Sequence, residues 1–362
     1  MKTNRFFLLF PILLPVLWLQ SAERELGICP CMSGPFLEWE ALTPETPQEA
    51  GPYKARALAV DPDEGTLYAL TTSTLWKSAD QGNHWTVLAD EKNISGKLWY
   101  GLALVFDPHT GGLGIFLKDP PAQRVQSAVS LDEGNTWNPV DRVIMDGDKG
   151  RSYGWSWGQV DWANDPTRML ARMHHSTRLW FSEDAGSNWK EIAESPYFGF
   201  APDGAILVAD PSIGNIRRST DQGETWEVVA ENLAVHAFRP VIHGDHIYWL
   251  GEGGLFRGNA SGSDWEPVGS ALRYAYWGPY YGETEDDIIV ATKDGVFHTA
   301  DAGYLWTKIA DNPIMTAEAH REKPTQHFWL IGRNTFGWDV KNQILFLADG
   351  KLHKLDLSPL LN

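Results

Sequence analysis

Short segments rich in β-branched and aromatic residues recur along the chain, and Gly, Asp and Pro separate them. Such segments predict strands that are joined by tight turns. They are clearest at residues 55–61, 65–70 and 74–78, and again at 288–292 and 295–299. No stretch between them places apolar residues at helical spacing, so the pattern predicts an all-β fold.

A motif repeats among these strands: Ser or Thr, any residue, Asp, any residue, Gly, two further residues, then Trp. Ser and Asp side chains bond backbone amides where a chain reverses, and Gly accepts a positive φ, so the motif predicts a hairpin turn. A calcium site is the alternative, but each copy has only one or two carboxylates and lacks the distant ligand of an EF-hand loop. We therefore expect no metal. The intact copies are residues 78–85, 130–137, 182–189, 219–226 and 299–306, and a decayed copy, in which Ala260 replaces the aspartate, is 258–265.

This motif resembles the Asp-box, also called the bacterial neuraminidase repeat, over nearly the whole chain after residue 22. Proteins with this repeat are β-propellers in which the box joins the third and fourth strands of a blade. They include sialidases, xyloglucan-cleaving enzymes, sortilin-type receptors and photosystem II assembly factors. The resemblance implies a fold and leaves the activity open.

The number of blades follows from the boxes and from the two ends of the chain. Six box tryptophans mark six blades, and segments 336–340, 344–348 and 352–357 add three strands after the last box. Residues 36–42 read like the strand that follows a box, so we expect them to complete the last sheet. Residues 23–362 then form a single seven-bladed β-propeller closed by its N-terminal strand, which leaves no open sheet edge.

The first 22 residues have the features of a secretory signal peptide. Lys2 and Arg5 precede an apolar run at 6–19, and Ser21 and Ala22 supply the small residues of a cleavage site. The run is shorter than the roughly 20 residues that span a bilayer. We expect a secreted or periplasmic monomer with no stable membrane span, and we assign no role to the only two cysteines, Cys29 and Cys31.

Composition excludes one class of partner. Lys and Arg number 30 against 47 Asp and Glu, which gives a formal charge of 30 − 47 = −17. No stretch concentrates enough basic residues to follow a phosphate backbone, so we expect no nucleic acid.

Candidate binding residues gather where the innermost strands begin, on the face opposite the boxes. Aromatic rings there suit sugar rings, although packing between blades is the alternative role. Arginines near the same face suit a carboxylate, sulfate or phosphate, although ordinary salt bridges are the alternative. The aromatic candidates are Trp99, Tyr100, Trp155, Trp157, Tyr276, Trp277 and Trp338, and the arginine candidates are Arg151, Arg172, Arg239, Arg273 and Arg321.

The catalytic candidates are Tyr153, Asp161, Arg172, His174 and His175. Asp161 has no evident second carboxylate for acid–base work, and a structural role is its alternative. Tyr153 with His174 or His175, and Arg172 to neutralise a uronic acid, would suit a polysaccharide lyase. The Arg-Ile-Pro motif of sialidases is absent, which argues against that activity.

These observations favour an exported propeller that recognises or processes glycan, in particular acidic polysaccharide, without a cofactor. Glycoside hydrolase and lyase activity both stay open. The alternative is a non-catalytic scaffold that binds protein, like the sortilin-type receptors and the photosystem assembly factors.

Overall fold

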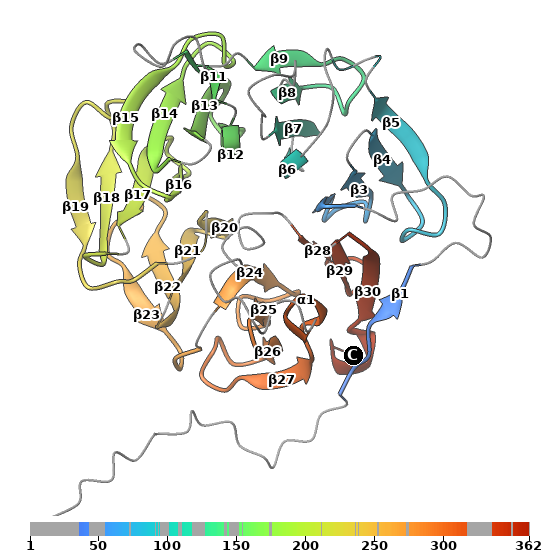
Figure 1. Ribbon diagram of the computed structural model, residues 1–362. Helices are drawn as coiled ribbons and strands as arrows, with labels where there is room; N and C mark the ends of the chain where they lie inside the picture. The colour runs from blue at the N-terminus through green and yellow to red at the C-terminus, as the bar shows by residue number, and fades with distance from the viewer. Residues whose placement is uncertain are drawn as a thin grey trace, which may run out of the picture.

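The computed structural model shows seven blades arranged in a ring (Figure 1). It describes residues 36–42, 55–71, 74–90, 92, 94, 101–107, 111–117, 127–140, 143–144, 152–153, 155–173, 176–210, 212–235, 237, 239–251, 253–272, 275–316, 335–348 and 350–361. The predicted seven-bladed all-β fold is confirmed.

Each blade is a four-stranded antiparallel sheet whose first strand lies nearest the centre of the ring. The blades are, in order: β2 (Ala57–Val60), β3 (Leu67–Leu70), β4 (Thr74–Ser78), β5 (Thr86–Asp90); β6 (Gly101–Asp107), β7 (Gly112–Leu117), β8 (Ser127–Ser130), β9 (Asn138–Val140); β12 (Trp155–Asp161), β13 (Asp165–Met173), β14 (Arg178–Ser182), β15 (Lys190–Glu194); β16 (Tyr197–Phe200), β17 (Ile206–Asp210), β18 (Asn215–Ser219), β19 (Glu227–Ala230); β20 (Val241–His243), β21 (His246–Gly251), β22 (Gly254–Asn259), β23 (Glu266–Val268); β24 (Ala275–Tyr281), β25 (Ile288–Thr292), β26 (Gly295–Thr299), β27 (Thr307–Ala310); β28 (Phe336–Asp339), β29 (Ile344–Ala348), β30 (Leu352–Asp356) and β1 (Glu40–Ala41).

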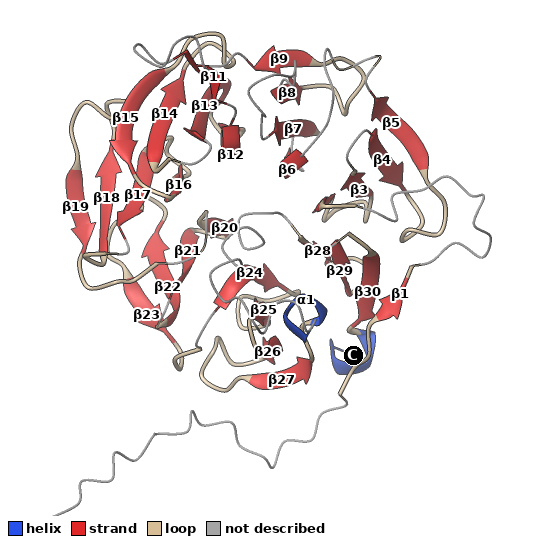
Figure 2. Ribbon diagram, viewed as in Figure 1, coloured by secondary structure: helices blue, strands red, loops and turns tan. Residues whose placement is uncertain are grey.

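Few of the described elements lie outside the blades. The ribbon of β10 (Val143–Ile144) and β11 (Ser152–Tyr153) joins the second blade to the third. Helices are short and blue in Figure 2: in the part of the chain that the structure describes they are α1 (Pro313–Thr316) and α4 (Ser358–Leu361). No helix there has the length and apolar content that crossing a membrane requires.

The N-terminal strand closes the ring. β1 pairs with β30 through Glu40 opposite Lys354 and Ala41 opposite His353. The indole nitrogen of Trp39 donates to the carbonyl of Asp311 at 2.8 Å, which ties the same segment to the sixth blade. The predicted closure by residues 36–42 is therefore confirmed, although only two of those residues form ladder pairs.

The repeated motif forms hairpin turns, which we call box turns. The intact box turns share one set of hydrogen bonds. In the third blade, Ser182 Oγ donates to Asp184 Oδ1 at 2.9 Å and accepts the Gly186 amide at 2.9 Å. Asp184 Oδ1 also accepts the Asn188 amide at 2.8 Å, and Trp189 Nε1 donates to the Gly186 carbonyl at 2.9 Å. Gly186 has φ of +82°, and a Cβ there would lie 2.8 Å from a neighbouring valine methyl group. The serine and aspartate side chains thus stabilise the turn through hydrogen bonds to its backbone.

The decayed turn of the fifth blade is held by another residue. Asn259 Oδ1 accepts the amides of Ser261 at 3.1 Å and Ser263 at 3.0 Å, a different set of bonds from those that the aspartate makes in an intact copy. Trp265 Nε1 still donates to the Gly262 carbonyl at 2.8 Å. Among the residues that the structure describes, no three His, Cys, Asp or Glu side chains gather as a metal site would require.

Strand alternation gives the ring two faces. The turns between first and second strands lie on the same face as the box turns, which we call the turn face. Connections between blades, and turns between second and third strands, lie on the opposite face, which we call the loop face. The functional site predicted from the sequence belongs to the loop face.

Candidate functional site

Two adjoining cavities lie within the ring of innermost strands, with volumes of about 340 and 450 Å³. The first strands of all seven blades contribute to their walls, so the cavities are parts of the central channel. Phe106, Arg239 and Ile242 line both cavities and therefore mark their junction.

Both cavities reach the turn face. Ala163 and Pro202 come from first-to-second strand turns and line the smaller cavity, and Pro62 and Gly282 do the same for the larger. The loops of the loop face lie mostly outside the described residues, so the loop-face site stays a prediction.

Arg239 is the cation among the described residues that line the two cavities. Its side chain is exposed, and it forms no hydrogen bond or ion pair with another described residue. Surrounding protein nevertheless lowers the pKa of its guanidinium through desolvation, and Tyr280 opposes this shift. The two observations agree if the guanidinium projects into water that the channel walls enclose.

The aromatic groups near Arg239 are neutral. Burial raises the pKa of both Tyr280 and Tyr281, so their hydroxyls keep their protons at neutral pH. The His243 ring stacks on Tyr281 with centroids 3.9 Å apart and planes at 3°. Burial lowers the pKa of His243, which Glu285 only partly opposes, so the imidazole is also uncharged at neutral pH.

Asp161, a predicted catalytic candidate, forms a buried ion pair. Its side chain is 1% exposed, and its Oδ2 lies 2.5 Å from Arg168 Nη1. Burial raises the pKa of the Asp161 carboxyl, although a hydrogen bond from Asn164 and the charge of Arg168 lower it. Arg168 also donates to the carbonyl of Gly204 at 2.7 Å, so the pair connects the third blade to the fourth. This geometry favours the structural role for Asp161.

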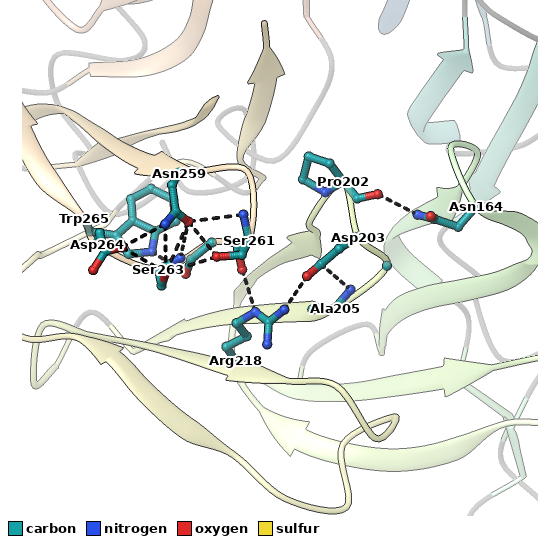
Figure 3. A network of polar contacts seen from close by, with 12 residues as sticks. Asn164, Pro202, Asp203, Ala205, Arg218, Asn259, Ser261, Ser263, Asp264 and Trp265 are labelled. Atoms are coloured by element: carbon teal, nitrogen blue, oxygen red, sulfur yellow. Dashed lines mark hydrogen bonds and ion pairs between the residues drawn. The ribbon is translucent and has the colours of Figure 1, made fainter. Parts of the chain in front are cut away.

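A chain of polar contacts on the turn face continues this connection toward the fifth blade (Figure 3). Asn164 donates to the Pro202 carbonyl at 3.2 Å. Arg218 forms an ion pair with Asp203 and donates to the Ser261 carbonyl at 2.5 Å. Three consecutive blades are thereby held together around one side of the channel mouth.

The aromatic candidates with described side chains are mostly buried. Trp155 is 1% exposed and packs on Trp189 with ring centroids 4.4 Å apart. Trp277 packs on Phe336 at 5.2 Å, and Trp338 Nε1 donates to the Tyr281 carbonyl at 2.8 Å. These contacts correspond to packing within and between blades, the alternative role for these rings.

The structure brings together Arg172, Tyr276 and a further residue, Tyr197. Burial raises the pKa of the Tyr197 phenol, the charge of Arg172 lowers it, and Tyr276 raises it. Burial lowers the pKa of Arg172 to about 10. Its Nη1 lies 3.5 Å from the Pro196 carbonyl.

Several sequence candidates have no described position. The backbones of Tyr153 in β11 and Trp157 in β12 are placed, but their side chains are not described. The candidates that lie outside the described residues are Trp99, Tyr100, Arg151, His174, His175, Arg273 and Arg321.

Sequence reasoning missed Phe106, Ile242, His243 and Arg168. For Arg168 a signal existed, because it follows Asp161 closely across a predicted hairpin and carries the opposite charge. No comparable sequence signal shows which apolar side chains enter the channel.

Comparisons with known proteins agree with this architecture. No family model matches the chain. A segment of 52 residues, 13% of this chain, is 44% identical to vacuolar protein sorting/targeting protein 10 of Komagataella phaffii, and the match spans only 3% of that protein's length.

Two solved structures cover nearly the whole chain. YCF48 bound to D1 peptide aligns with a TM-score of 0.53 at 14% identity, over 91% of this chain and 99% of YCF48. A chain of a mitotic checkpoint complex aligns with a TM-score of 0.51 at 12% identity, over 98% of both chains. At these identities the likenesses show the fold alone.

Proposed function

We propose that this chain is an exported, non-catalytic scaffold that holds a peptide segment of a partner protein in the channel mouth on the turn face. The observation that carries this proposal is the apolar wall shared by the two cavities. Ile242 is 47% exposed there, beside Phe106. Exposed apolar side chains in a concave site suit the side chains of a peptide, whereas a sugar would need more polar partners.

Two further points support a scaffold. Asp161, the acid best placed by sequence for catalysis, is paired with Arg168 and buried. YCF48 was solved with a D1 peptide, and the short matching segment belongs to a protein of sorting and targeting. We transfer the general activity, binding of peptide or protein, to this chain as part of the proposal.

Selection from a displayed library of random heptapeptides tests this function. We expect the wild-type chain to select peptides, and Ile242→Asp to abolish their binding because a carboxylate replaces an apolar contact. Ile213→Asp is the matched control, since Ile213 is 60% exposed in a turn of the fourth blade on the loop face. Absence of selected peptides, or binding that Ile242→Asp leaves unchanged, would refute the proposal.

Recognition of acidic glycan is the second candidate, and Arg172 beside Tyr197 and Tyr276 favours it. A guanidinium with two phenols suits the carboxylate and hydroxyls of a uronic acid. An acidic-glycan array, with Arg172→Met as the comparison, tests this reading. Incubation then separates mechanisms, because lyase action creates an unsaturated product that absorbs ultraviolet light, and hydrolysis creates reducing ends.

A further inference from the structure

The junction of the two cavities carries a charge that the proposed function does not use. Among the residues that line either cavity, the acidic side chains are Asp107 and Asp161, and both are buried. Asp161 is neutralised by Arg168. His243 is uncharged at neutral pH for the reason given above. Arg239 is therefore the exposed charge of the described channel lining, and it is positive in a chain of net charge −17.

A peptide bound in the channel must supply a partner for this guanidinium. A peptide that fills the cavities removes water from Arg239, and a buried guanidinium without a partner is strongly unfavourable. A carboxylate removes that cost, because it can accept two parallel hydrogen bonds from the planar guanidinium. The neutral hydroxyl of Tyr280, near Arg239, adds a donor.

The position of Arg239 determines where in the peptide the carboxylate lies. Arg239 lines both cavities, which extend from it in different directions along the ring. The smaller cavity continues along Val160 and Phe200, and the larger along Leu58 and Tyr281. A segment that occupies both cavities therefore places apolar side chains on each side of the group that meets Arg239.

We propose, on the basis of the proposed function, that the channel selects an internal Asp or Glu flanked on both sides by apolar residues, with the acidic carboxylate paired to Arg239. A carboxylate at the end of a chain has an apolar neighbour on one side only. It would fill one cavity and leave the other to water.

The heptapeptide selection also tests this inference, with both library ends joined to linkers so that no peptide carries a free carboxylate. We expect the wild-type chain to enrich a central acid with apolar neighbours. A selected peptide should bind at least tenfold more tightly than the same peptide with Gln or Asn in place of the acid. In Arg239→Gln the two peptides should bind equally tightly. Arg239→Lys keeps the charge but loses the planar donor pair, so it should retain part of the affinity difference.

The outcomes separate the two proposals. Selected peptides that lack an acid would overturn this inference, as would an acid preference that persists in Arg239→Gln. The scaffold proposal is unaffected by either result, provided that Ile242→Asp abolishes peptide binding. A higher affinity for a free C-terminal carboxylate than for the internal acid also overturns it. Failure to select any peptide overturns both proposals, as does binding of acidic glycan that depends on Arg239 without peptide binding. Unchanged melting temperatures show that the variants fold.

Discussion

Replacement of Arg168 by Met tests the physical account of the Asp161 site most directly. Met keeps much of the apolar stem of Arg168, whose guanidinium carbon lies 5.3 and 5.6 Å from the ring centroids of Phe200 and Phe181. The substitution removes the ion pair to Asp161 and the hydrogen bond to the Gly204 carbonyl. Asp161 then stays buried without its counter-charge.

The expected loss follows from this burial. Removal of one partner of a buried ion pair costs about 3–5 kcal/mol, because the remaining charge is uncompensated. At roughly 2 °C per kcal/mol for a chain of this size, the melting temperature should fall by about 6–10 °C. Scanning calorimetry measures the melting temperature, and urea titration gives the change in unfolding free energy.

A double variant provides the control. Asn in place of Asp161 removes the buried charge, so the double variant Asp161→Asn/Arg168→Met should be more stable than Arg168→Met alone. Acidification should also reduce the deficit of Arg168→Met, because the loss of the cation raises the pKa of Asp161 further and the carboxyl can take up a proton. A deficit below about 1 kcal/mol, or a double variant less stable than the single one, would refute the reasoning. A catalytic Asp161 would instead give an Asp161→Asn variant that is stable and loses a measurable activity.

Three further predictions concern the ring and its turns. Deletion of residues 1–42 should lower the melting temperature sharply because the last blade loses β1, while deletion of residues 1–35 should not. Equal melting temperatures of the two deletion variants would contradict closure of the ring by β1. Ser182→Ala should cost about 1–2 kcal/mol in urea unfolding, since it removes three hydrogen bonds of a buried hydroxyl, whereas the exposed Ser187→Ala should cost far less. Equal effects of the two substitutions would exclude the turn mechanism. Hydrogen bonds from the Thr225 side chain and backbone, and from Ser219, hold the pKa of Asp221 at about 2. This carboxylate should therefore stabilise the fold above pH 3.8 and lose that contribution as the pH falls toward 2. An NMR titration of Asp221 with a midpoint near 3.8 would contradict this prediction.

The ring of blades was predictable because the residues that specify its turns lie close together in the sequence. Each box turn depends on side chains within eight consecutive residues, as the bonds of Ser182 and Asp184 show, so the turn can be recognised in sequence. The count of blades and the closing role of residues 36–42 follow from the spacing of such turns. The rescue of the decayed turn by Asn259 was not predictable in this way, because its carbonyl acts from a position where the motif accepts any residue.

The candidate site was less predictable because it depends on side-chain direction. An innermost strand can turn a ring toward the channel or into the neighbouring blade, and Trp155 and Trp277 turn into packing contacts. Arg239 was identified as an anion-binding candidate, but its position between two cavities requires the three-dimensional ring. Ile242 is an ordinary strand residue in sequence and becomes a channel wall only after closure.

The pairing of β1 with β30 fixes an order of events during folding. Six of the blades form from consecutive strands, whereas the last joins Glu40 to Lys354, which are 354 − 40 = 314 positions apart. Closing a loop of that length costs roughly 5 kcal/mol in chain entropy, so the strand synthesised first finds its partner last. Until then β30 presents an open edge that the β1 strand of a second molecule can occupy. Refolding at high protein concentration should therefore produce strand-exchanged dimers, and dilution before refolding should suppress them.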